Sequence, residues 1–109
     1  MLSKFDVSSN EICGLDKYGR GEYDTSGLTA LVIAIINLKE LNISNNYLKA
    51  EGAAIVAPAL EDNGVMSKLT IGDSETPATF EKGMTEANFS GAGLGPGGAL
   101  IVATWLQYK

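Results

Sequence analysis

The chain of 109 residues contains no histidine and a single cysteine, Cys13. Zinc sites are built mainly from histidine and cysteine, so their usual ligand sets cannot be assembled here. The carboxylates do not follow the spacing of a calcium-binding EF-hand. Histidine is also the commonest general base, so no such group is present to activate the Cys13 thiol. We therefore expect a protein that is not an enzyme and that needs no metal or other cofactor.

Positive charge and long apolar runs are also scarce. The 8 Lys and Arg residues are outnumbered by 13 Asp and Glu residues and are spread singly, whereas nucleic acids and anionic membranes bind clustered cations. The longest apolar run, Leu28–Ile36, is far shorter than the roughly 20 residues that span a bilayer. The single cysteine forms no internal disulfide, and the N-terminus has no signal-peptide layout. These features predict a cytoplasmic protein with neither a nucleic-acid nor a membrane partner.

An 11-residue pattern occurs twice in full. Residues 38–48 place apolar side chains at pattern positions 1, 4, 6 and 11 and an asparagine, Asn46, at position 9. Residues 2–12 do the same, with Asn10 at position 9. This is the L-x-x-L-x-L-x-x-N-x-L template of leucine-rich repeats. It predicts a short parallel strand whose positions 4 and 6 point inward, followed by a turn in which the asparagine bonds backbone groups left unpaired.

Two weaker copies of the pattern follow, at residues 66–76 and 84–94. Both lack the asparagine, which is replaced by Ser74 in one and by Ala92 in the other. A serine retains part of the hydrogen-bonding capacity and an alanine retains none. We therefore expect the row of asparagines to fail toward the C-terminus, where a looser turn is made by the glycines at 91, 93 and 95.

Three apolar segments between the copies are predicted to be helices. They span residues 27–37, 52–60 and 97–106. With the strands, they give a chain that resembles the ribonuclease-inhibitor-like subclass of leucine-rich repeats. That resemblance rests on the two full templates and on Glu51-Gly52-Ala53, Ala59-Leu60 and Asn63.

The resemblance covers nearly the whole chain except about residues 13–26 and 74–83, and it implies one α/β domain, residues 1–109. Its expected architecture is a curved solenoid of about four parallel strands, with helices on the convex side. The function that it implies is a non-catalytic scaffold for protein–protein interaction.

The spacing of the copies is irregular. They start at residues 2, 38, 66 and 84, which gives spacings of 36, 28 and 18 residues, and only the second is regular for the subclass. The first spacing indicates an insertion at residues 13–26. The third indicates a lost helix at residues 75–83, whose gap Phe80 would fill.

The strand face directed away from the helices is the usual binding surface of a solenoid. Pattern position 3 alternates in charge on this face, as Lys4, Glu40, Lys68 and Glu86. The alternation fits either a stabilising cross-strand ladder or a docking surface. The candidate contacts on this face are Glu40, Asn42, Lys68, Thr70, Glu86 and Asn88.

The insertion is the second candidate surface. It gathers Tyr18, Arg20 and Tyr23 among glycines, and tyrosine and arginine are enriched at binding hot spots. Two interpretations remain open. The loop contacts a partner, or its tyrosines fold back over the apolar helix of residues 28–36, whose outer side needs cover from the loop or from a second chain.

An alternative function is suggested by Gly93–Gly98, which fits the G-x-G-x-x-G pattern of dinucleotide sites. That fingerprint needs a second strand with an acidic residue about 20 positions later, and the sequence does not provide one. Another alternative is a structural fragment of a longer repeat array.

The first predicted strand forms an edge that carries Leu2, Phe5 and Val7. An open strand edge and the uncovered end of a solenoid both favour association. We expect a homo-oligomer through this N-terminal edge strand, or a longer array.

Overall fold

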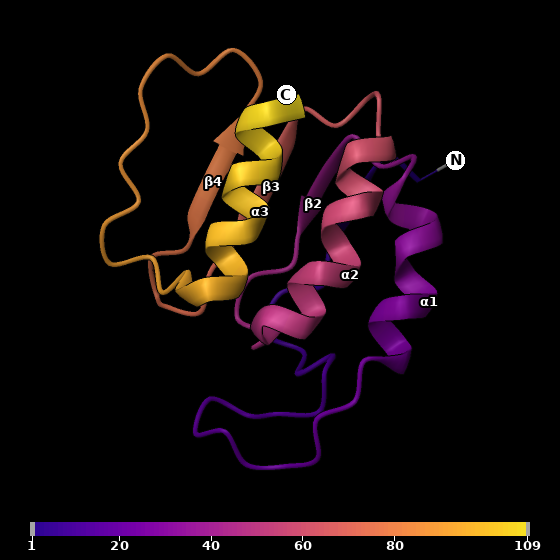
Figure 1. The fold of residues 1–109 in the computed structure, drawn as a ribbon, viewed down its shortest axis with the longest axis vertical. Coiled ribbons are helices and arrows are strands. Elements are labelled where there is room, and N and C mark those ends of the chain that lie inside the picture. The colour runs from indigo at the N-terminus through magenta and orange to yellow at the C-terminus, as the bar shows by residue number, and fades with distance from the viewer. Residues whose placement is uncertain (1, 109) are drawn as a thin grey trace.

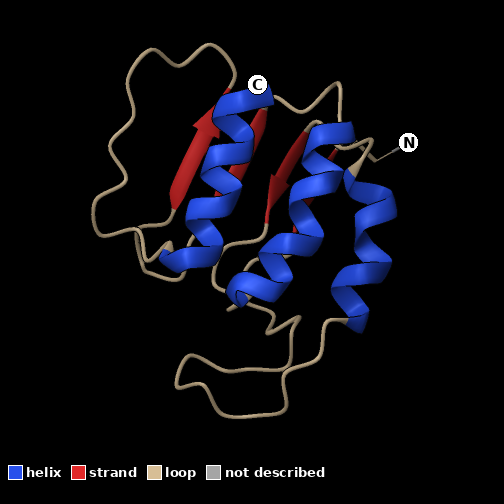
Figure 2. Cartoon of the chain, viewed as in Figure 1, coloured by secondary structure: helices blue, strands red, loops and turns tan. Residues whose placement is uncertain are grey.

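A computed structural model describes residues 2–108 as one sheet covered on one face by helices (Figures 1 and 2). The strands of this described part are β1 (Lys4–Asp6), β2 (Glu40–Asn42), β3 (Lys68–Ile71) and β4 (Ala78–Glu81). The helices are α1 (Ser26–Ile35), α2 (Lys49–Asp62) and α3 (Gly95–Tyr108). The fold is mixed α/β, with the opposite face of the sheet left open.

The strands lie in the order of the chain, β1-β2-β3-β4. The pairs β1–β2 and β2–β3 are parallel, as the two full repeats predict, and Phe5, Leu41 and Leu69 stand in register. The third pair is antiparallel, with Leu69 opposite Phe80. The sheet is therefore mixed, and the expectation of four parallel strands was wrong for the last one.

The fourth strand also lies elsewhere in the sequence than predicted. Residues 84–94 form no strand, since residues 84–88 are exposed and only Ala92 is fully buried. The strand is Ala78–Glu81, within the connection expected to carry only a lost helix. A parallel return needs a crossover of about a dozen residues or more. Only residues 72–77 separate β3 from β4, so the chain can turn straight back and pair antiparallel.

The core lies between the sheet and the helices. Alternate strand residues point into it, including Leu41, Leu69 and Phe80, all of which are buried. Phe80 fills the space beneath α3, with its ring centroid 4.5 Å from Phe89 and 5.6 Å from Trp105. Burying a side chain of this kind contributes about 1.5–3 kcal/mol to the stability of the fold.

All three predicted helices are present, and their bounds differ by a few residues. The helix expected at 52–60 begins at Lys49 and ends at Asp62, immediately before Asn63. The Asn63 side chain is buried and bonds backbone groups of Ile35, Leu38, Val65 and Met66. None of the helices described is long and apolar enough to cross a membrane.

The predicted asparagine turn is confirmed at Asn46. Its side chain is fully buried and donates to the carbonyl oxygens of Val7, Ile43 and Ser44. In the third copy, the Ser74 hydroxyl oxygen accepts a hydrogen bond from the Thr76 backbone N–H at 3.2 Å. The fourth copy buries Ala92 instead.

Candidate functional site

The insertion is a closed loop whose two arms touch through glycines. A Cβ atom on Gly14 would lie 2.1 Å from the carbonyl oxygen of Glu22, and one on Gly21 would lie 2.1 Å from that of Gly14. Both glycines have positive φ, 85° and 115°. At the base of the loop, the Asp24 N–H donates to the Cys13 carbonyl at 2.9 Å. Larger residues would force the arms apart, so the glycines define the shape of the loop.

Asp16 organises the tip of this loop. Its Oδ1 accepts the backbone N–H of Tyr18 and of Arg20, each at 2.9 Å. Its Oδ2 lies 2.8 Å from Arg20 Nε in an ion pair. These contacts, first the backbone hydrogen bond from Arg20, lower the pKa of the Asp16 carboxyl below its ordinary value. The conformation of the tip is therefore held by contacts within the loop itself.

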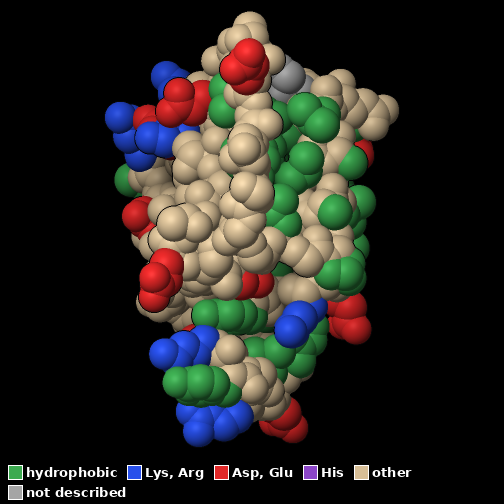
Figure 3. All heavy atoms as spheres, turned by 90° about the vertical axis from the view of Figure 1, so that its left-hand side faces the viewer, with side chains coloured by type: hydrophobic (Ala, Val, Ile, Leu, Met, Phe, Trp, Pro, Cys, Tyr) green, Lys and Arg blue, Asp and Glu red, His purple; other side chains and the backbone are tan. Residues whose placement is uncertain are grey.

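Tyr18 is the most prominent side chain of the tip. It is 69% exposed, and its ring lies between two cations, with Lys17 Nζ 5.1 Å and Arg20 Cζ 4.9 Å from the centroid. Figure 3 shows Lys and Arg side chains gathered with hydrophobic ones at the lower end of the molecule, where Figure 1 places the insertion. An exposed aromatic ring held between two cations is thus presented to solvent.

Tyr23, the other tyrosine of the insertion, is directed toward the protein. Its hydroxyl accepts the Gly52 N–H at 2.9 Å and donates to the Leu48 carbonyl at the start of α2. Burial raises the pKa of this hydroxyl, and burial likewise raises the pKa of the Cys13 thiol nearby. Of the two interpretations, folding back is observed for Tyr23, but toward α2 and not over the helix of residues 28–36, while contact of the loop with a partner stays a prediction. Tyr18 is free for contact, and Tyr23 ties the loop to α2.

A groove of about 540 Å³ runs between the tip and the turns that follow the strands. It is lined by Ser9, Glu11, Asp16, Lys17, Tyr18, Arg20, Asn45, Tyr47, Ser74 and Glu75. Parallel α/β sheets commonly bind ligands at this edge, outside the carboxyl ends of their strands.

The turn residues of the groove were not anticipated from the sequence. Pattern positions 8 and 10 have positive φ in both full copies, between 51° and 56°, at Ser9, Glu11, Asn45 and Tyr47. The only local signal was Asn45, because asparagine tolerates this left-handed region better than most residues do.

The open face of the sheet carries two separate cross-strand ion pairs. Lys4 Nζ lies 3.0 Å from Glu40, and Lys68 Nζ lies 4.0 Å from Glu81. Thr70 and Thr79 share a hydroxyl hydrogen bond of 3.0 Å across the last pair of strands. A shallow hollow on this face is lined by the polar and charged residues Lys4, Asp6, Glu40, Asn42, Lys68, Thr70 and Thr79.

Two predicted residues of this face lie off the sheet. Glu86 and Asn88 are exposed in the segment before α3, because the fourth strand is not where the repeat placed it. Glu81 and Thr79 occupy their places in the register, opposite Lys68 and Thr70. The alternation of charge across the sheet therefore persists through a different residue.

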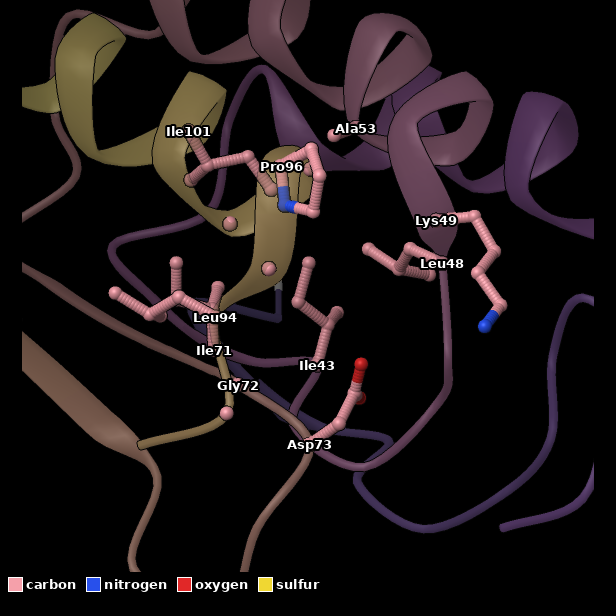
Figure 4. A pocket seen from close by; sticks show the side chains of 14 residues that line it. Ile43, Leu48, Lys49, Ala53, Ile71, Gly72, Asp73, Leu94, Pro96 and Ile101 are labelled. Carbon is pink, nitrogen blue, oxygen red and sulfur yellow. The ribbon is translucent and has the colours of Figure 1, made fainter. Parts of the chain in front are cut away.

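The glycines at 93–98 pack the start of α3 closely against the rest of the chain. A Cβ atom on Gly97 would lie 2.6 Å from the Lys49 carbonyl oxygen, and one on Gly93 would lie 2.9 Å from the Asp73 backbone. The segment lines a cavity of about 150 Å³, toward which the Asp73 carboxylate is directed (Figure 4). Close packing thus accounts for these two glycines, and the cavity is lined by charges of both signs, from Lys49 and Asp73.

Within residues 2–108, no group of three or more cysteine, aspartate or glutamate side chains is arranged to hold a metal ion. Comparison with protein-family models, curated proteins and solved structures returned no match.

Proposed function

We propose that this protein is a non-catalytic scaffold for protein–protein interaction, with the architecture of a short leucine-rich-repeat solenoid. The observation that carries the proposal is the insertion tip, where exposed Tyr18 lies between Lys17 and Arg20 on an internally bonded loop. Tyrosine and arginine dominate binding hot spots, and a rigid loop loses little conformational entropy when it binds. The two full repeats support the solenoid architecture.

The chemistry of the tip indicates the kind of partner surface that it fits. Lys17 and Arg20 flank Tyr18, while Arg20 also pairs with Asp16, and Glu11 and Glu75 line the same groove. The site therefore presents both signs of charge, and it fits a partner segment that also carries both. Tyr18 offers that segment an exposed aromatic ring. Tyr47 lines the adjoining groove and would contact residues flanking those that reach the tip.

The open sheet face has a secondary role in this proposal. Lys4 and Glu40 already pair with each other, as do Lys68 and Glu81, and Asn42 Oδ1 accepts two hydrogen bonds from Ser44. Their capacity is partly used within the protein. Contacts with Glu40, Asn42, Lys68 and Thr70 would therefore contribute specificity more than affinity.

The test is recovery of partner proteins by immobilised wild type and by Tyr18→Ala/Arg20→Ala, with identification of the bound chains. Tyr23 is left intact because its hydroxyl supports the fold. The matched control is Tyr108→Ala, an exposed tyrosine on α3. We expect the double variant to lose a specific partner that the control retains. Equal recovery by all three proteins would refute the role of the insertion.

A nucleotide-binding function through Gly93–Gly98 is the alternative from another class. Its cavity, about 150 Å³, is below the roughly 300 Å³ at which ligand pockets usually begin. Thermal denaturation with and without ATP or NAD separates the two functions. The scaffold proposal expects no change in melting temperature, whereas a specific nucleotide site would raise it in a concentration-dependent way.

A further inference from the structure

The outer edge of β1 is unpaired among the residues that the structure describes. The Ser3 carbonyl oxygen accepts hydrogen bonds from the backbone N–H groups of Lys39 and Glu40, and the Val7 N–H donates to the Asn42 carbonyl oxygen. The backbone groups of the odd-numbered residues of β1 therefore face β2. Backbone groups alternate in direction along a strand. The N–H and C=O groups of Lys4 and Asp6 therefore face outward, where no strand receives them.

We propose that this edge pairs with the same edge of a second copy of the chain, antiparallel and related by a two-fold axis at Phe5. The sequence of β1 is complementary to itself in that register. Lys4, which also pairs with Glu40 of its own chain at 3.0 Å, lies opposite Asp6 of the second copy, and the same pair repeats on the other side of the axis. The outward backbone groups of these two residues exchange hydrogen bonds, and opposite charges on facing strands stabilise the pair.

The apolar side of β1 favours the same arrangement. Phe5 and Val7 are only partly buried, and they line a small void together with Leu31 and Ala34 of α1. Figure 1 shows α1 as the outermost helix at this end, with the insertion lying beyond its first residues and not along its outer side. In the two-fold dimer, Phe5 faces Phe5 of the second copy, and the two α1 helices cover this apolar strip.

The other end of the sheet is a poorer partner for β1. The Phe80 ring of β4 lies 4.5 Å from the tilted ring of Phe89, and Figure 1 shows the segment between β4 and α3 on the outer side of the last strand. Head-to-tail stacking would have to displace that segment. The two-fold arrangement needs only the edge that is open, and it closes at two copies.

The first experiment measures the mass of the protein by light scattering across a dilution series, for wild type and for Lys4→Glu, Asp6→Lys and the double swap. Each single substitution places like charges opposite each other twice per dimer, so the dissociation constant should rise about tenfold. The double swap restores opposite charges and should recover dimerisation. Lys82→Glu is the matched control, a charge reversal at an exposed residue after β4 at the other end of the sheet, and it should associate like wild type.

Amide hydrogen exchange on the wild-type protein gives a second readout that does not depend on the variants folding. Exchange at the Lys4 and Asp6 amides should slow as protein concentration rises, because dimerisation bonds them. The Val7 amide is bonded to Asn42 in either state and should stay constant. A monomer at millimolar concentration, or assemblies larger than a dimer, would overturn the proposal. So would single variants that associate as well as the double swap.

Discussion

The side-chain oxygen of Asn46 accepts a hydrogen bond from the backbone N–H of Asn10 at 3.0 Å, joining the turns of two successive repeats. The same oxygen accepts a hydrogen bond from the Ile12 N–H at 3.2 Å. The side-chain nitrogen of Asn46 donates to the carbonyl oxygens of Val7 in the first repeat and Ile43 in the second. One buried side chain thus satisfies backbone groups on either side of a repeat boundary. The stacking of the two repeats therefore depends on it.

Replacing Asn46 with alanine should destabilise the protein by about 2–3 kcal/mol, because several backbone groups would remain buried without partners. A loss of this size lowers the melting temperature by roughly 10–20 °C in a domain of about 100 residues. Thermal denaturation followed by circular dichroism measures it.

The matched control is Asn10→Ala, at the same position of the first repeat. The Asn10 side chain is exposed and donates within its own turn, to the carbonyl oxygens of Val7 and Ser8. Removing this side chain should lower the free energy of unfolding by about 1 kcal/mol or less, since water can replace its hydrogen bonds. Equal effects at the two positions would contradict the role assigned to burial.

The two tyrosines of the insertion should respond differently to the loss of a hydroxyl. Tyr23→Phe removes the group that accepts from Gly52 and donates to Leu48, and should destabilise the fold by about 1 kcal/mol. Tyr18→Phe keeps the exposed ring and should leave stability unchanged within about 0.5 kcal/mol. Urea denaturation of both variants measures the difference. A larger loss for Tyr18→Phe would mean that the roles are reversed.

Much of the fold could be predicted because the repeat encodes it at short range. The first three strands and the three helices follow from apolar spacing, which is set by which side chains point inward. The alternation of Ala78, Thr79, Phe80 and Glu81 is too short to outweigh the weak match at 84–94. The last strand is decided by the length of the connection after β3, which favours an antiparallel return.

The candidate site could be predicted only in part. Tyr18 and Arg20 were identified by residue type, but sequence cannot separate Tyr18 from Tyr23, because which ring reaches α2 depends on how the loop closes through Gly14 and Gly21. Tyr47 occupies a pattern position at which any residue occurs. Its place in the groove follows from backbone conformation and from the folding of the insertion over the turns.

Adding a methyl group at Gly97 should separate α2 from α3. A Cβ atom there would meet the Lys49 carbonyl at 2.6 Å and the Ala53 side chain at 3.2 Å, and backbone cannot yield as a flexible side chain does. Gly97→Ala should therefore lower the free energy of unfolding by about 1–3 kcal/mol. Gly64→Ala is the control, because nothing lies within 4 Å of its added Cβ, and it should be nearly neutral. Chemical denaturation compares them.

The ion pair between Asp16 and Arg20 should make the stability of the loop depend on pH. Hydrogen bonds from Arg20 and Tyr18 hold the pKa of Asp16 below its ordinary value of 3.8, so the folded state favours the ionised carboxylate. Its stabilising effect is then complete above that ordinary value and is lost as pH falls through the lower, folded pKa. Carbon-detected NMR titration should show a low midpoint for Asp16, and Arg20→Ala should raise it.

The substitution Asp16→Asn tests the same ion pair through the melting temperature of the whole protein. It should melt at a lower temperature than wild type at neutral pH, and the difference should shrink once the pH falls below the ordinary value for aspartate, because the wild-type carboxylate is then protonated as well. Glu22→Gln removes an exposed charge from the same loop and controls for the change in net charge. A difference between Asp16→Asn and wild type that persists unchanged into acid would show that the hydrogen bonds at the tip do not depend on the ionised carboxylate.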